Sequence, residues 1–275
     1  KRKDLIVTLI VYTVAIVTMK LISLIAANFD VMLAFVYPTA MATMLVRILA
    51  SEKAASVVTV LTAASAGIIF HEGYAAILQM DAALYILFGG FASLFFMRSV
   101  EKRSHILQAS TVVMAVNLVF IAFYLLMTQS DYVLSEIAFY VSAGIISGLL
   151  SGALTMGLLP FFESLFGILS TMRLIELSNP NHPLLKKILT ETPGTYHHSV
   201  MVANLAEAAC EAIDADGLLA RVGCYYHDVG KTRRPAFFIE NQMGINPHDS
   251  LSPDASADII IGHTTDGAEL LRQHK

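Results

Sequence analysis

The sequence predicts an all-α membrane protein: a polytopic bundle of transmembrane helices followed by a smaller helical domain. Hydrophobic residues make up 56% of the chain and charged residues 15%, against about 45–50% and about 25% in an average soluble domain. The apolar excess falls almost entirely before Pro160. After Pro160, charged residues return and apolar residues recur at helical spacing, which predicts a domain outside the lipid.

Six stretches before Pro160 are apolar enough to be membrane spans, which need about 20 mostly apolar residues. They cover residues 5–27, 31–49, 55–70, 82–97, 106–127 and 137–159. Helices are expected because lipid cannot satisfy open backbone groups. In the last stretch Gly144, Gly148 and Gly152 recur every four residues, which predicts close packing inside the bundle, with a homodimer interface as the alternative.

The connections between these stretches alternate in positive charge. Every second one carries Lys or Arg, and the intervening ones carry neither. The residues concerned are Lys1, Arg2 and Lys3, then Arg47 and Lys53, then Arg98, Lys102 and Arg103. Because cytoplasmic loops are enriched in Lys and Arg, this pattern predicts a multi-pass protein of the cell membrane, embedded in the lipid bilayer, with its C-terminal domain in the cytoplasm.

Composition disfavours several other classes of protein. The net charge of −4 gives no sign of nucleic-acid binding. Cys210 and Cys224 are the only cysteines, which favours a reducing compartment. The predicted spans have no runs of acidic, His or Arg residues suited to transport, so sensing or anchoring is the better interpretation. The chain starts without Met and ends inside an expected helix, so we expect a fragment of a longer protein.

The boundaries follow from turn residues. We expect the bundle to cover residues 1–160, with Pro160 at the end of its last helix. A membrane-proximal connector would span 161–182, and Pro183 suits the first position of a helix that opens the last domain, 183–275.

Three helices of this domain are predicted to bring metal-binding side chains together. They cover residues 195–213, 218–229 and 255–262, with Thr195 capping the first and Gly230 ending the second. His198 lies in the first, His227 and Asp228 end the second, and His263 follows the third. His197 would point about 100° away from His198, and His182 falls in a loop, so neither is a favoured ligand.

This mixture of imidazole and carboxylate suits divalent metals such as Mn, Fe or Zn. Two ions about 3.5–4 Å apart can hold a phosphoryl group and activate water. Lys231 is placed to meet a phosphate oxygen or Asp228 itself. Arg233 and Arg234 form a small basic cluster that suits the remaining phosphate or an anionic lipid.

The motifs resemble those of the HD-domain metal-dependent phosphohydrolases. The chain contains H-S-V-M-V-A, H-D-V-G-K and then a single His. S-N-P-N-H-P-L-L, P-G-T-Y-H-H-S, A-R-V-G-C-Y-Y-H-D-V-G-K and F-F-I-E-N-Q look like the bacterial seven-transmembrane HD proteins of the PgpH type. This resemblance covers essentially the whole chain, beginning with the helices before the domain.

The resemblance implies a cytoplasmic phosphodiesterase that opens cyclic di-AMP to pApA at a centre of two Fe or Mn ions. It implies His198, His227, Asp228 and His263 as ligands. From their charge and placement, we expect Asp228 and Lys231 to be catalytic and Lys231 and Arg234 to bind substrate. The resemblance also implies an extracellular domain and a seventh span before Lys1, and further His and Asp ligands after Lys275. The fragment would then hold only part of the centre.

Two alternatives stay open. One is an HD phosphohydrolase acting on cyclic di-GMP, a guanosine alarmone or a nucleotide monophosphate. The residues after His263, T-T-D-G-A-E-L-L, lack the paired His and the Gly-Tyr-Pro run of the cyclic di-GMP enzymes. The other is a non-catalytic membrane receptor with a degenerate HD module, which metal analysis would distinguish.

Overall fold

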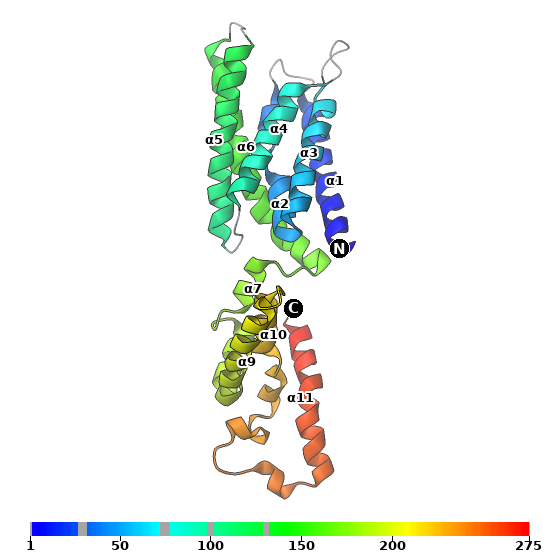
Figure 1. Cartoon of the computed structure of the whole chain (residues 1–275), viewed down its shortest axis with the longest axis vertical. Helices are drawn as coiled ribbons and strands as arrows, with labels where there is room; N and C mark the ends of the chain where they lie inside the picture. The colour runs from blue at the N-terminus through cyan, green and yellow to red at the C-terminus, as the bar shows by residue number, and fades with distance from the viewer. Residues whose placement is uncertain (1, 27–31, 72–77, 98–101, 129–131, 275) are drawn as a thin grey trace. The chain divides into compact units, whose positions relative to one another are not determined.

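The computed structural model describes residues 2–26, 32–71, 78–97, 102–128 and 132–274. Within these ranges the regular elements are α-helices and 3-10 helices and none is a strand, which confirms the predicted all-α class (Figure 1). The chain divides into two compact units, Lys1–Ser170 and Thr171–Lys275. Lys1, Arg98 and residues 27–31, 72–77 and 129–131, on which part of the charge argument falls, lie outside the described ranges.

The first unit is a bundle of apolar helices. Its elements are α1 (Arg2–Ala26), η1 (Leu33–Val36), α2 (Met41–Leu49), α3 (Glu52–Ile69), α4 (Met80–Phe96), α5 (Arg103–Met127) and α6 (Leu134–Phe166). Among the described residues, four helices are long and apolar enough to cross a membrane, namely α1, α3, α5 and α6. The η1–α2 stretch and α4 are shorter and apolar, so six spans remain a prediction.

The second predicted span is not one continuous helix, and that expectation was wrong. Tyr37 precedes Pro38 and has φ −57° and ψ 134°, the extended conformation that a following proline favours. The break leaves backbone N–H and C=O groups without helical hydrogen-bond partners inside an apolar bundle. Three hydroxyl groups bind them: Tyr85 donates to Phe35 O (2.8 Å), Ser147 donates to Tyr37 O (2.5 Å), and Ser151 accepts from Ala40 N–H (3.2 Å).

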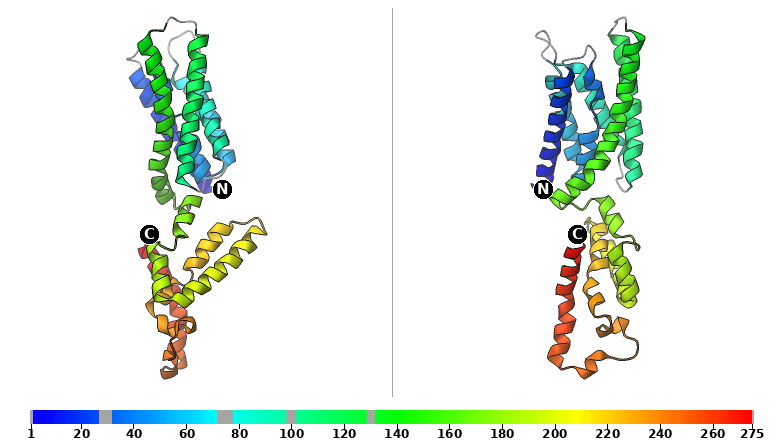
Figure 2. Two further views of the ribbon diagram at one scale, coloured as in Figure 1. Left: turned by 90° about the vertical axis from the view of Figure 1, so that its left-hand side faces the viewer. Right: turned by 180° about the vertical axis from the view of Figure 1, so that it is seen from behind.

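Helices α5 and α6 lie side by side and pack closely (Figure 2). A Cβ atom on Gly148 would stand 2.6 Å from Met114 Cα, and one on Gly152 would stand 2.7 Å from Ser110 Cβ. Such approaches leave no room for a side chain at either position. The glycine face predicted for close packing inside the bundle therefore contacts α5.

Helix α6 does not end at Pro160, contrary to the prediction. It continues to Phe166 with Pro160 inside it, so residues 161–166 of the expected connector extend this helix. Proline fixes a helical φ and removes one backbone donor, which a long, well-packed helix tolerates at a cost. The helix stops at Gly167, whose φ of 58° is the left-handed conformation typical of a C-terminal exit.

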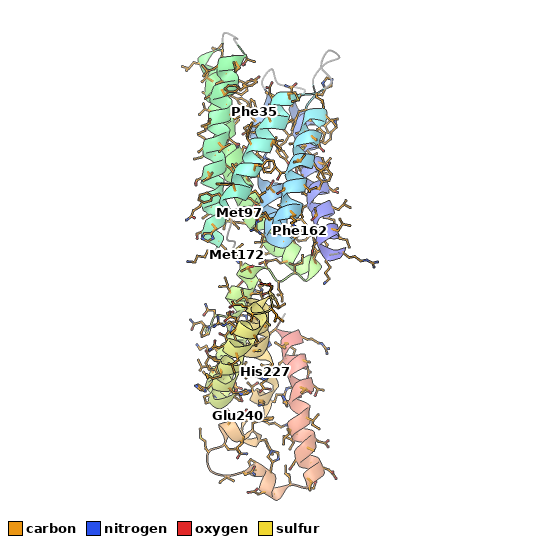
Figure 3. The ribbon with its side chains drawn as sticks, viewed as in Figure 1. Phe35, Met97, Phe162, Met172, His227 and Glu240 are labelled. Atoms are coloured by element: carbon orange, nitrogen blue, oxygen red, sulfur yellow. The ribbon has the colours of Figure 1, made fainter. Side chains whose placement is uncertain are left out.

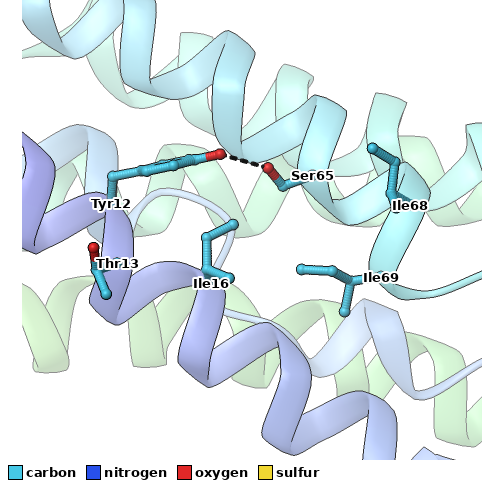
Figure 4. Close-up of a pocket in the computed structure, with 6 residues that line it drawn as sticks. All are labelled: Tyr12, Thr13, Ile16, Ser65, Ile68 and Ile69. Carbon is cyan, nitrogen blue, oxygen red and sulfur yellow. Dashed lines mark hydrogen bonds between the residues drawn. The ribbon is translucent and has the colours of Figure 1, made fainter.

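A groove of about 430 Å³ lies between α1 and α3 (Figure 4). Tyr12 Oη and Ser65 Oγ form a 2.7 Å hydrogen bond across it. Its lining residues are Tyr12, Thr13, Ile16, Ser65, Ile68 and Ile69. Since the two hydroxyl groups bind each other, most of the lining that remains is aliphatic.

The second unit consists of short helices around a small apolar core. Its elements are α7 (Thr171–Leu177), α8 (Pro183–Glu191), α9 (Pro193–Glu211), α10 (Gly217–Tyr226), η2 (Val229–Arg233), η3 (Pro235–Phe237), η4 (Ile239–Asn241), η5 (Pro247–Ser250) and α11 (Pro253–Gln273). The core comprises Leu174, Leu184, Leu185, Ile188, Val222, Tyr226, Val229 and Leu270. Helix α9 packs on α10, and α11 packs on η2.

Three predicted helix ends in this unit are corrected. Helix α9 begins at Pro193, so Thr195 lies inside its first turn and is not its cap. Helix α10 ends at Tyr226, before His227 and Asp228. Helix α11 runs from Pro253 to Gln273 and carries His263 in its middle. The predicted side chains nevertheless come from the three predicted regions.

Candidate metal centre

Three of the four predicted ligands form one cluster in the second unit. His198 on α9, His227 after α10 and Asp228 before η2 each offer a ligand atom, and these atoms lie within 4.8 Å of one another. The rings of His198 and His227 have centroids 5.7 Å apart. Figure 3 labels His227 within this unit. Helix α10 delivers His227 to the cluster because its last turn packs on the core through Tyr226.

The carboxylate of Asp228 lies between two imidazole rings. Its Oδ2 is 3.2 Å from His227 Nε2, and its Oδ1 is 3.3 Å from His263 Nε2. The Asp228 side chain is only 7% exposed. The structure therefore brings the fourth predicted ligand, His263, into contact with the cluster through Asp228.

Backbone carbonyls fix the orientation of both rings. His227 Nδ1 lies 2.8 Å from Cys224 O, and His263 Nδ1 hydrogen-bonds to Ile260 O. Because a carbonyl oxygen only accepts, each Nδ1 carries the proton and each Nε2 of a neutral ring presents a lone pair. This is the arrangement that carbonyl groups impose on histidines that bind metals.

These contacts test whether a metal suits the site. A neutral imidazole lone pair facing a carboxylate oxygen places two acceptors together, and His227 and His263 both do this to Asp228. Either protons or a cation must lie between them. The donor set of three imidazoles and a carboxylate fits Zn, Fe or Mn.

The charges at the cluster reinforce one another. Burial opposes ionisation of Asp228, but hydrogen bonds from His227 and Lys231 outweigh it and hold the pKa of this carboxyl well below its ordinary value. The hydrogen bond with Asp228 raises the pKa of His227, and burial offsets this only in part. Asp228 is therefore an ionised, partly desolvated carboxylate, which is the form that binds a cation.

Lys231 lies between two carboxylates. Its Nζ is 2.8 Å from Asp228 Oδ2 and 2.8 Å from Glu240 Oε1. Burial lowers the pKa of Lys231, but these hydrogen bonds outweigh burial and leave that pKa raised. Of the two partners predicted for Lys231, a phosphate oxygen or Asp228, the structure pairs it with Asp228.

The basic cluster after Lys231 has two different members. Arg233 binds two carboxylates of α11, Asp266 at 2.8 Å and Glu269 at 2.7 Å. Arg233 thus ties η2 to the helix that carries His263, which makes it a poor substrate ligand. Arg234 is exposed, so its charge faces solvent.

Gly230 has a different role from the one predicted. Helix α10 ends before it, so it does not form the exit of that helix. A Cβ atom on Gly230 would stand 1.9 Å from His263 O and 2.6 Å from Gly267 N. Only glycine lets the backbone of η2 approach α11 so closely, and this contact sets the distance between Asp228 and His263.

The two histidines not favoured as ligands lie outside the cluster. His182 Nδ1 is 3.2 Å from the Tyr226 hydroxyl, which donates to Leu177 O at 2.7 Å. His197 is exposed on α9. Neither belongs to the group of clustered ligand atoms.

Sequence reasoning assigned no role to Glu240 and Asn241. They lie in η4 and contact both Lys231 and the start of α9. The motif F-F-I-E-N-Q was noticed only as part of a family resemblance. A carboxylate nine residues after Lys231, in a segment without helical periodicity, was the available signal.

Two family descriptions match the chain. The one described as "7TM receptor with intracellular HD hydrolase" matches residues 1–170. The one described as "HD domain" matches residues 195–275. The first match covers the whole of the first unit, and the second covers most of the second unit, where all four predicted ligands lie.

Two curated relatives align with most of this chain. The cyclic-di-AMP phosphodiesterase PgpH of Bacillus subtilis (strain 168) is 48% identical over 276 residues, which are 100% of this chain and 39% of that protein. The protein of the same name from Listeria monocytogenes serotype 1/2a (strain 10403S) is 44% identical over 247 residues, covering 88% of this chain and 33% of that protein. The chain thus spans well under half the length of either relative.

Two solved structures also match part of the chain. The crystal structure of the L. monocytogenes phosphodiesterase PgpH HD domain is 66% identical over 34% of this chain and 46% of that one, with a TM-score of 0.34. The structure of that domain in complex with cyclic-di-AMP is 67% identical over 35% of this chain and 45% of that one, also with a TM-score of 0.34.

Proposed function

The chain belongs to the family of 7TM receptors with an intracellular HD hydrolase, and we propose that it is a membrane-anchored, metal-dependent phosphodiesterase that hydrolyses cyclic di-AMP to pApA. The observation that carries this proposal is the cluster of His198, His227 and Asp228. The 48% identity to a cyclic-di-AMP phosphodiesterase, over the whole of this chain, supports the choice of substrate.

The proposed cofactors are two divalent ions, Fe or Mn. His198, His227, Asp228 and His263 would hold them in this chain. When bound, such ions supply Lewis acidity to a phosphodiester and lower the pKa of water. The ring orientations set by Cys224 O and Ile260 O support this assignment, since both leave Nε2 free to act as the ligand atom.

The protein's own side chains would divide the remaining work. Asp228 would help hold the ions and orient the nucleophilic water, and Lys231 keeps Asp228 ionised through its 2.8 Å contact. Lys231 is also the proposed catalytic cation next to the phosphodiester. Arg234, which is exposed, would meet a phosphate of the substrate.

The first unit, Lys1–Ser170, would be a membrane unit that anchors the enzyme in the cell membrane. The second unit, Thr171–Lys275, would be an HD unit in the cytoplasm. The alternation of Lys and Arg in the connections supports this orientation. Many large apolar side chains of α1, α3 and α5 are exposed in the described structure, and lipid is the proposed solvent for them. The proposal includes a homodimer, whose interface is not the glycine face of α6 because that face packs on α5.

The decisive variant is Asp228→Asn in the full-length protein, purified in detergent and supplied with Mn²⁺ or anaerobic Fe²⁺. Asparagine keeps the size of the side chain and removes the charge that binds the ions. Hydrolysis of cyclic di-AMP should fall by about 10³-fold or more, as measured by the release of pApA. Asp258→Asn, an exposed carboxylate on α11, is the matched control and should keep the wild-type rate.

The same preparation distinguishes the alternatives. Turnover of cyclic di-GMP or a guanosine alarmone in preference to cyclic di-AMP would move the proposal to another substrate. Wild-type protein that binds no ion under Mn²⁺ or Fe²⁺ supplementation, and hydrolyses none of these nucleotides, would favour a receptor. Undiminished turnover by the Asp228→Asn variant would remove Asp228 from the mechanism.

A further inference from the structure

The segment Phe238–Asn241 is bonded to the start of α9, the helix that carries His198. Asn241 Oδ1 accepts from the backbone N–H groups of Gly194 (3.1 Å) and Thr195 (3.2 Å), and Asn241 Nδ2 donates to Thr195 Oγ1 (2.8 Å). The first N–H groups of a helix have no partner within it. Asn241 Oδ1 is the acceptor for two of these N–H groups, and it therefore fixes the position of the first turn of α9.

The same segment is bonded to the residue that contacts Asp228. Glu240 Oε1 accepts from Thr195 Oγ1 (2.9 Å) and from Lys231 Nζ (2.8 Å). Lys231 Nζ then donates to Asp228 Oδ2 (2.8 Å). A continuous series of hydrogen bonds therefore joins α9 to Asp228 through Glu240 (Figure 3 labels Glu240 and His227).

Backbone packing reinforces these bonds. A Cβ atom on Gly194 would stand 1.9 Å from Glu240 O, so the two backbones are in direct contact at the first turn of α9. Phe238 is buried. The centroid of its ring lies 5.6 Å from that of His263 and 5.1 Å from Lys231 Nζ. The segment thus touches all three regions that carry the proposed ligands.

We propose that Glu240 and Asn241 are positioning residues that set the placement of His198 relative to Asp228, so that metal affinity depends on both. This inference rests on the metal centre of the proposed function. His198 follows Gly194 by four residues, about one helical turn, so a shift of the first turn of α9 moves His198 by a similar amount. Neither Glu240 nor Asn241 belongs to the clustered ligand atoms.

Glu240 also has an electrostatic part in this arrangement. Lys231 is shared between two carboxylates at equal distances of 2.8 Å. Without the charge of Glu240, the Lys231 ammonium would pair with Asp228 alone and compete more strongly with a cation for Oδ2. The removal of either side chain therefore acts in the same direction, toward weaker metal binding.

The test is the Mn²⁺ affinity of the full-length protein in detergent, measured from the electron paramagnetic resonance signal of free Mn²⁺. Glu240→Gln and Asn241→Ala should each weaken binding about 10- to 100-fold, as other residues that orient metal ligands do. Two controls should bind Mn²⁺ as wild type does. They are Glu191→Gln, at an exposed carboxylate on α8, and Gln242→Ala, where the side chain bonds to Asn246 and not to α9 or Lys231 among the contacts described.

Each titration is run at a temperature at which circular dichroism shows the metal-free variant to be folded. The dissociation constant then reports the site and not the folded fraction. Saturating Mn²⁺ should restore the wild-type kcat in Glu240→Gln and Asn241→Ala, because their ligands are intact, but not in Asp228→Asn. Wild-type affinity in either folded variant would overturn the positioning role of that residue and leave the proposed function standing, whereas wild-type protein that binds no Mn²⁺ would overturn both proposals.

Discussion

Asn117 in the membrane unit and Asp228 in the HD unit are both buried polar side chains, yet their surroundings differ in kind. Asn117 is fully buried on α5, and its amide donates to Ser147 Oγ at 3.1 Å and lies 3.4 Å from Thr39 Oγ1. All of these groups are neutral, and each donor meets an acceptor. Asp228 is charged and faces the Nε2 atoms of two imidazole rings, which present acceptors when neutral.

The difference separates a structural polar network from a candidate ligand site. A buried polar group stabilises a fold only when its hydrogen bonds are matched. The network around Asn117 is matched, and it also binds the backbone groups opened by the break before α2. Lys231 donates to Asp228 Oδ2, but the contacts of Asp228 with the two imidazole rings are matched only when protons or a cation lie between them, so the full stability of this network depends on what the solution supplies.

The two units share one structural feature, which is close backbone contact at a glycine. Gly148 lets α6 approach Met114 of α5, and Gly230 lets η2 approach His263 of α11. The first contact holds two long helices that have many others. The second holds a five-residue turn whose position sets the distance between two proposed ligands. The HD unit should therefore be the more sensitive of the two to a lost glycine.

The largest expected effect comes from Gly230→Ala. Its Cβ would meet backbone atoms of His263 and Gly267, which cannot move aside as a flexible side chain can. We expect a loss of about 3 kcal/mol of stability in the HD unit, measured as faster hydrogen exchange in α9, α10 and α11. Mn²⁺ binding should weaken in the same variant, because η2 carries Asp228 away from His263.

Gly223→Ala is the matched control. Gly223 is exposed inside α10, and a Cβ there meets nothing within 4 Å. Alanine should therefore stabilise the unit by about 0.5–1 kcal/mol. Equal slowing or equal acceleration of exchange by the two substitutions would show that helix propensity, and not the contact with α11, dominates at Gly230.

The next largest expected effect is that Mn²⁺ binding slows hydrogen exchange in the HD unit alone. At a Mn²⁺ concentration 100 times the dissociation constant, binding should stabilise the HD unit by about 2.7 kcal/mol. Hydrogen exchange should slow in α9, α10 and α11 and stay unchanged in α5 and α6. Equal protection of both units would contradict the distinction between the matched network around Asn117 and the network around Asp228 that needs a cation.

The sequence predicted the parts of this picture that depend on local pattern. Helical periodicity located the regions of His198, His227 and His263, and the residue types identified the metal-binding chemistry. The glycine spacing of α6 predicted its packed face. These features are encoded by residues that are neighbours along the chain or on one helix face.

The parts that were missed depend on contacts between distant residues. The contacts of Glu240 and Asn241 with α9 include hydrogen bonds between positions 46 and 47 residues apart. Nothing in the sequence spacing of these residues predicts such contacts. Gly230 looked like a helix exit because glycine has that role often, while its actual constraint comes from α11. Pro160 looked like a helix end, but packing of α6 on both sides of it carries the helix through.

The smallest expected effect is also the sharpest test of the comparison. Asn117→Ala removes the amide that binds Ser147, but Ser147 still donates to Tyr37 O. The membrane unit should lose about 1 kcal/mol, the range measured for single hydrogen bonds between membrane helices, as followed by SDS-induced unfolding. Gln108→Ala, an exposed amide on the same helix, is the control and should unfold as wild type does.

The affinity for Mn²⁺ should be unchanged in Asn117→Ala, because the network around Asn117 is complete without any contribution from the HD unit. A tenfold loss of affinity would mean that the polar core of the bundle sets the geometry of the metal centre. The break before α2 would then be the first place to look for that coupling, since Ser147 binds its open backbone and Asn117 binds Ser147. An unchanged unfolding profile would instead show that this buried amide, although matched, adds nothing to the bundle.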